Sequence, residues 1–222
     1  AASDVYKRQP FTDGSVLVAR ERAWLITDSR YIEAAQKAAP DCVTVQMFDR
    51  AHSQLSLLKA ALKEAGVEKL GGEEEKLSHG RYAAMEKELG LPLLPAQALL
   101  SELRAAKTEA EIERMIQAQR ISEKALEEVL QIIRPGMSER EVAAELVYRM
   151  LRCGSEGNSF DPIVVTGAKT SLPHGVPGDE IIHAGDFITM DFGSLKDGYC
   201  SDMTRTVAVG YGTDEMKHVY DT

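Results

Sequence analysis

The stretch Ile188-Thr-Met-Asp-Phe-Gly-Ser-Leu-Lys-Asp-Gly-Tyr-Cys-Ser-Asp-Met-Thr-Arg-Thr-Val-Ala-Val209 decides the fold of the second half of this chain. Two apolar segments flank the polar turn Lys196-Asp197-Gly198, a pattern that predicts a β-hairpin. If Lys196 and Asp197 form the two-residue loop, Asp191 lies directly opposite Asp202. If Asp197 and Gly198 form the loop, as their turn chemistry favours, the two aspartates are diagonal neighbours. Either register places both carboxylates on one face.

Two carboxylates this close on a hairpin repel each other unless a cation compensates them. Two divalent metal ions about 3.5–4 Å apart can be bridged by such carboxylates. The flanking segments are strongly apolar, which favours burial of both side chains, and a buried carboxylate must be paired, protonated or metal-bound. Arg205 is the obvious organic counter-charge. Spacing alone therefore leaves open a metal site and a solvated or arginine-paired arrangement.

Composition excludes several classes of protein. The 222 residues carry a net charge of −9, which argues against nucleic acid and anionic membrane surfaces as partners. No apolar run approaches the roughly 20 residues that span a bilayer, and the N-terminus lacks the apolar core of a signal peptide. The three cysteines show no CxxC spacing, so we expect a reduced, cytoplasmic protein. Cys200, between the aspartates, is interpreted as a packing residue because a lone thiol is a poor ligand for a hard metal.

Strand and helix patterns alternate from residue 11 to about residue 95, which predicts an α/β domain. The expected elements are a hairpin of strands 15–19 and 23–27, a helix at 31–39, a strand at 42–47, a helix at 55–65, a strand at 67–70 and a helix at 82–89. The nine residues before Pro10 join no periodic pattern, and we interpret residues 1–9 as non-native.

The pattern changes near residue 104, where we place a domain boundary. Thr108 with Glu111 has the spacing of a capping box, and it predicts a long helix that ends at Pro135-Gly136. Ser138 opens a second helix in the same way. A strand at 162–166, the aspartate hairpin and a helix that starts at residue 213 complete the elements expected over residues 105–222.

Four segments together carry more information than any one residue. They are Ser159-Phe-Asp-Pro-Ile-Val-Val-Thr-Gly167, Leu172-Pro-His-Gly175, Gly185-Asp-Phe-Ile-Thr-Met-Asp-Phe-Gly193 and Gly198-Tyr-Cys-Ser-Asp-Met-Thr-Arg-Thr206. In order and spacing they resemble the pita-bread metallopeptidases, and within that group the Xaa-Pro aminopeptidases and Xaa-Pro dipeptidases (prolidases). The intervals of 17 residues from His174 to Asp191 and 11 from Asp191 to Asp202 match the pattern of that family.

The resemblance implies a fold and a site. It implies an α/β creatinase-like N-terminal domain at 11–104, followed by the first half of an α+β pita-bread (creatinase/aminopeptidase) catalytic domain at 105–222. Asp191 would bind one metal and Asp202 would bridge two divalent ions, usually Mn²⁺, with Co²⁺ or Zn²⁺ as substitutes. His174 would be the catalytic loop histidine. The substrate would be a peptide with proline in second position, and the enzyme a homodimer or higher homo-oligomer.

The family also needs a metal-binding histidine and two glutamates downstream of the hairpin, beyond residue 222. We therefore expect this polypeptide to be an inactive fragment, cut at both ends. The compact N-terminal domain favours an aminopeptidase over a dipeptidase. A metal-free creatinase-like hydrolase and a non-catalytic pita-bread binding protein would have the same fold. The sequence after residue 222 would separate them from the metallopeptidase.

Overall fold

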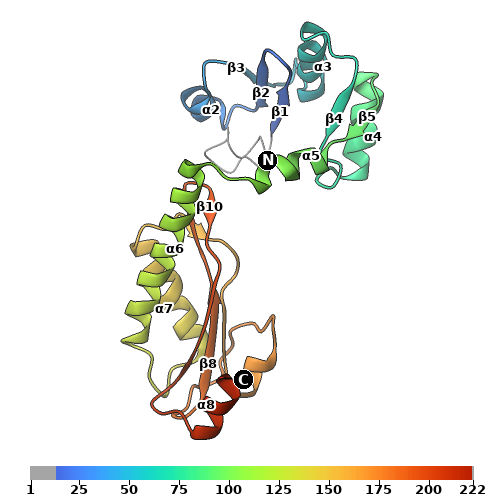
Figure 1. Ribbon diagram of the computed structural model, residues 1–222. Helices are drawn as coiled ribbons and strands as arrows, with labels where there is room; N and C mark the ends of the chain where they lie inside the picture. Colours follow the sequence, from blue (N-terminus) through green and yellow to red (C-terminus); the bar gives the residue numbers. More distant parts are fainter. Residues whose placement is uncertain (1–13, 222) are drawn as a thin grey trace. The chain divides into compact units, whose positions relative to one another are not determined.

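The computed structural model describes residues 14–221, which form two compact units that meet in sequence at Ala106 and Lys107 (Figure 1). In the first unit, β1 (Gly14–Val18) pairs antiparallel with β2 (Ala23–Thr27), and β2 pairs parallel with β3 (Val43–Met47). Every residue of β2 is buried, because α3 (Gln54–Glu64) contributes to the core on one face and α2 (Ile32–Ala38) to the core on the other.

The predicted strand at 67–70 is wrong in position, since β4 spans Leu70–Gly72. Gly66, with φ +63°, and Val67 instead close the C-terminus of α3, and the Val67 N–H donates to the Leu62 carbonyl as in a Schellman motif. The helix cap thus uses the residues that looked like the start of a strand.

Two elements near the end of the first unit were not predicted from the sequence. After α4 (His79–Leu89), β5 (Leu93–Pro95) pairs parallel with β4, and α5 (Gln97–Ala105) follows. No residue next to α5 caps it. The cap comes from Glu74, whose carboxylate accepts the N–H groups of Ala96 and Gln97 from 22 and 23 residues away.

The second unit begins with α6 (Glu109–Leu130) and α7 (Glu139–Arg152), and both predicted capping boxes are present. The first helix ends at Leu130 rather than at Pro135. The Ile132 and Ile133 N–H groups both donate to the Val129 carbonyl, which closes the last turn before the proline. None of the helices within residues 14–221 combines the length and apolar character needed to cross a bilayer.

The predicted hairpin is confirmed, with the register in which the two aspartates are diagonal neighbours. Asp197 and Gly198 form the loop with φ of +47° and +79°, as a type I′ turn requires. Asp191 therefore lies opposite Thr204. The hairpin joins two antiparallel sheets, in the order β11-β8-β7 and β10-β9-β6. The strands are β6 (Gly157–Asn158), β7 (Ile163–Thr166), β8 (Phe187–Phe192), β9 (Ser194–Lys196), β10 (Tyr199–Cys200) and β11 (Met203–Ala208).

The central strand β8 alternates strictly between buried and half-buried residues. Ile188, Met190 and Phe192 are fully buried and pack in one core with residues of α6 and α7, the two helices that lie side by side along the sheet in Figure 1. The residues between them, Asp191 included, point to the opposite face. We call this opposite side of the β11-β8-β7 sheet the open face. The short helices η1 (Gly167–Ser171) and α8 (Asp214–Tyr220) complete the unit.

Candidate metal centre

Asp191 lies on the open face, in a row across the sheet with Ile163 of β7 and Thr204 of β11. Its carboxylate is half-buried, and the Thr204 hydroxyl donates a hydrogen bond of 3.0 Å to Oδ1. This bond holds the side chain in one orientation and leaves Oδ2 available to a ligand. Thr204 was not singled out from the sequence, although strand alternation from Asp202 places it on the same face.

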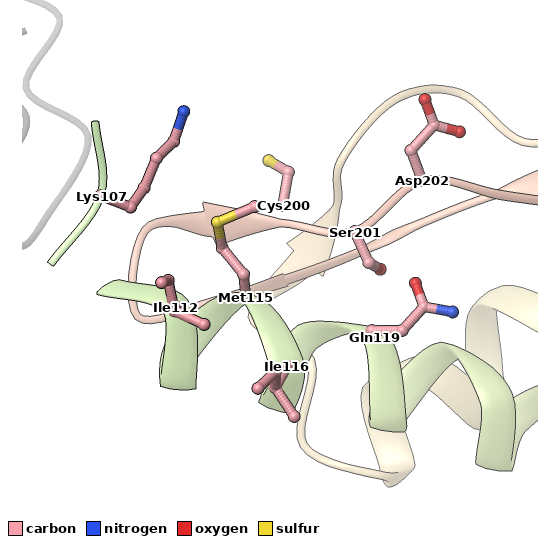
Figure 2. A pocket seen from close by; sticks show the side chains of 8 residues that line it. All are labelled: Lys107, Ile112, Met115, Ile116, Gln119, Cys200, Ser201 and Asp202. Carbon is pink, nitrogen blue, oxygen red and sulfur yellow. The ribbon is translucent and has the colours of Figure 1, made fainter. Parts of the chain in front are cut away.

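Asp202 comes directly before β11 and shares this face with Asp191. The Ser201 N–H donates to the Ser194 carbonyl, so the register of the hairpin continues unbroken past Asp202. Figure 2 shows the consequence: Ser201 points toward α6, whereas Asp202 and Cys200 point to the other side of the strand. Diagonal neighbours of this kind lie roughly 7–8 Å apart at their backbones, so both carboxylates could contribute to one metal centre.

The two aspartates have no cationic partner within residues 14–221. Arg205 bonds the Thr204 carbonyl instead, and no ion pair of the described chain includes either carboxylate. The expectation that both would be buried is wrong. Asp191 is half-buried and Asp202 is exposed, because the apolar residues beside them alternate onto the opposite, helix-covered face. The arginine-paired arrangement is thus not found.

The donor chemistry fits a hard divalent cation, since carboxylate oxygens are the ligands that Mn²⁺ prefers. The set is incomplete within the described residues: no third His, Cys, Asp or Glu joins the two aspartates to form a group that could hold a metal. Asp191 and Asp202 could therefore supply only part of a metal site.

A buried group of serines holds the hairpin one residue pair closer to the turn than Asp202. The Ser122 hydroxyl of α6 is hydrogen-bonded to the hydroxyls of Ser194 at 2.9 Å and Ser201 at 2.8 Å, one from each strand. On the far side, Ser159 donates to the Ser201 carbonyl at 2.8 Å. Gly193 makes this approach possible, because a Cβ at that position would lie 1.9 Å from the Ser201 carbonyl oxygen.

His174 is exposed on the loop that follows η1. The next residue, Gly175, is buried, and a Cβ there would lie 2.6 Å from Val165 Cγ1. Val165 belongs to β7, two residues along from Ile163 on the open face. The loop that carries His174 therefore packs against the face that carries Asp191, with its imidazole accessible.

Cys200 lines a hollow of about 730 Å³ beside Asp202, together with Ile112 and Met115 of α6 (Figure 2). Cys200 was expected to be a packing residue, but it is exposed and does not belong to the core. Partial burial nonetheless raises the pKa of its thiol.

Comparison with known families covers both units. Residues 6–106 match the creatinase/prolidase N-terminal domain, and residues 113–222 match metallopeptidase family M24. Residues 113–222 belong to metallopeptidase family M24. This confirms the resemblance found in the sequence and the fold class expected from it, a creatinase-like domain followed by part of a pita-bread catalytic domain.

Several solved structures are similar to this chain over nearly its whole length. One is the Xaa-Pro dipeptidase from Bacillus anthracis, with a TM-score of 0.89, 39% identity and coverage of 97% of this chain and 60% of that one. Another is the X-Pro aminopeptidase from Thermotoga maritima, with a TM-score of 0.90, 34% identity and coverage of 99% and 62%. Peptidase YqhT of Bacillus subtilis is 36% identical over 93% of this chain. The chain spans about 58% of the length of that relative.

Proposed function

We propose that the whole protein is a metal-dependent aminopeptidase that hydrolyses the peptide bond between an N-terminal residue and proline. One observation carries the proposal: Asp191 and Asp202 lie on the same face of one hairpin without a cation to compensate them among the described residues. M24 membership supports a divalent metal cofactor. Mn²⁺ is the proposed ion, with Co²⁺ or Zn²⁺ as substitutes.

The residues of the chain would divide the work. Asp191, oriented by Thr204, and Asp202, which is exposed, would hold the divalent ions through their carboxylate oxygens. His174 would position the substrate and carry a proton at its imidazole. When bound, the ions would supply a water of lowered pKa and polarise the carbonyl before proline. The remaining ligands, one histidine and two glutamates, are proposed to lie after residue 222.

Further properties of the whole protein are proposed from the family resemblance. They are domain limits at 11–104 and 105–222, a cytoplasmic location and a homodimeric or larger assembly. The substrate class is a peptide with proline in second position, and neither nucleic acid nor a membrane is a proposed partner.

A dipeptidase is the second candidate, because relatives named Xaa-Pro dipeptidase match as well as those named X-Pro aminopeptidase. The whole protein, loaded with Mn²⁺, should be given Ala-Pro and Ala-Pro-Ala, with Ala-Ala-Ala as the control. An aminopeptidase releases alanine from the tripeptide at a comparable or higher rate, whereas a dipeptidase cleaves only Ala-Pro.

The same assay separates a metal-dependent peptidase from a metal-free hydrolase and from a binding protein. A chelator should abolish turnover, and added Mn²⁺ should restore it. Turnover that survives complete metal removal would contradict the metal role and support a metal-free hydrolase. Failure to cleave any proline peptide with the metal bound would support a binding protein.

A further inference from the structure

Glu139, the first residue of α7, is the one charged side chain that is fully buried within residues 14–221. A buried carboxylate needs several hydrogen bonds to offset its lost hydration. Glu139 has three. Its Oε1 accepts the Thr166 N–H at 2.8 Å, and its Oε2 accepts the Gly178 N–H at 2.9 Å and the Lys169 ammonium at 2.5 Å.

The positions of these donors along the chain show what the carboxylate does. Thr166 is the last residue of β7, and Gly178 closes the proline-containing loop. Between them lie η1 and the loop with His174. One side chain therefore binds the backbone at both ends of the segment that presents the histidine. We call residues 166–178 the His174 segment.

Lys169 extends the same arrangement into the segment. Its ammonium also bonds the Val176 carbonyl and the Glu180 carboxylate, each at 3.0 Å. The hydrogen bond to Glu139 is the main cause of the raised pKa of Lys169, so the lysine stays charged. Two backbone bonds, from Glu139 N–H to the Glu180 carbonyl and from Arg140 N–H to the Gly178 carbonyl, fix the segment after the loop to the start of α7.

The middle of the His174 segment is fixed separately by the contact of Gly175 with Val165 on the open face. His174 itself is exposed and free to act. We propose that Glu139 is a positioning residue that holds the His174 segment over the open face and so sets the place of the imidazole relative to Asp191 and Asp202. This inference rests on the role proposed for His174.

The first test needs no activity. In the metal-free whole protein, Glu139→Gln should speed hydrogen exchange at the amides of 166–178 by about tenfold or more, because the amide group presents N–H donors to Gly178 and Lys169. The amides of β8 should keep their protection. Glu145→Gln is the matched control, since Glu145 also lies on α7 and also bonds a cation, Arg149, at 2.6 Å, without touching the segment.

The second test links Glu139 to the chemistry. In the metal-loaded whole protein, Glu139→Gln should lower kcat on a proline peptide by about 100-fold, the cost of a reacting group displaced by about 1 Å. In a His174→Ala background the same change should lower kcat by less than about threefold, because the two residues act as one unit. An equal fall in both backgrounds would overturn the proposal.

Wild-type exchange rates in the His174 segment of Glu139→Gln would also overturn it. If that variant does not fold, Lys169→Gln takes its place, because Lys169 is partly exposed. This change keeps the bonds from the Thr166 and Gly178 N–H groups to Glu139. Hydrogen exchange in the His174 segment should again be faster than in the wild type. If His174→Ala keeps full turnover, the proposed role of His174 fails, and the exchange result alone decides whether Glu139 holds the segment.

Discussion

Strands β2 and β8 are each the central strand of a three-stranded sheet, but they differ in what covers them. All five residues of β2 are buried, with Leu25 and Ile26 facing two different cores. In β8 every second residue is half-buried, and the open face carries Thr189 and Asp191. The difference is one of coverage: both faces of β2 are packed, whereas β8 packs with one face and presents a carboxylate with the other.

The largest expected effect comes from the open face. Asp202→Asn in the whole protein should lower metal-dependent turnover of a proline peptide by about 1,000-fold, as loss of a metal ligand removes several kcal/mol of transition-state stabilisation. The free energy of unfolding should hardly change, because Asp202 is exposed and makes no hydrogen bond with the described residues. Asp197→Asn, an equal change in the turn of the same hairpin, is the control. Retained turnover in Asp202→Asn would refute the assignment.

Packing variants test the comparison directly. Leu25→Ala and Ile26→Ala should each lower the free energy of unfolding of the first unit by about 2–5 kcal/mol, measured by the fluorescence of Trp24, the single tryptophan. In β8, Met190→Ala should lower the free energy of unfolding of the second unit by the same amount. Thr189→Ala should cost only about 1 kcal/mol, the value of its hydrogen bond to Thr206, with hydrogen exchange of β8 as the measure. Equal costs for Met190→Ala and Thr189→Ala would remove the distinction between the two strands.

A smaller effect is expected at the turn end of the hairpin, which Glu111 ties to α6. Its carboxylate accepts the Thr108 N–H and the Tyr199 hydroxyl, and these bonds lower its pKa from 4.5 to about 2. A lowered folded-state pKa stabilises the fold above pH 4.5, and the contribution is lost as the pH falls toward about 2. The unfolding midpoint of the second unit should fall over that range, and Glu111→Gln should flatten the dependence. Glu113→Gln, on the same helix, should leave it unchanged.

Local signals predicted much of the second unit. The Asp197-Gly198 turn, the alternation around it and the two capping boxes act over a few residues, and each was found where the sequence placed it. The burial of the aspartates was misjudged for a physical reason. In a strand, the apolar neighbours of a residue point to the opposite face of the sheet. They therefore indicate that the opposite face is buried, not that the residue between them is buried.

Features that depend on distant contacts were not predictable. Glu139 has the appearance of an ordinary acidic residue in the first turn of a helix, and nothing near it in sequence indicates that Thr166 and Gly178 will bury it. The cap that Glu74 provides to α5 has the same origin. In both cases one carboxylate serves backbone groups more than 20 residues away, a distance that no local pattern spans.

Gly193 has a consequence for anyone who tries to redesign this protein. A library that randomises the hairpin to change its metal or substrate preference has freedom at many positions, but at residue 193 a side chain of any size would overlap the Ser201 carbonyl oxygen and the Ser159 hydroxyl. Functional clones should retain glycine there regardless of the selection applied. Substitutions can thus be tried on either side of position 193, but position 193 itself must remain glycine.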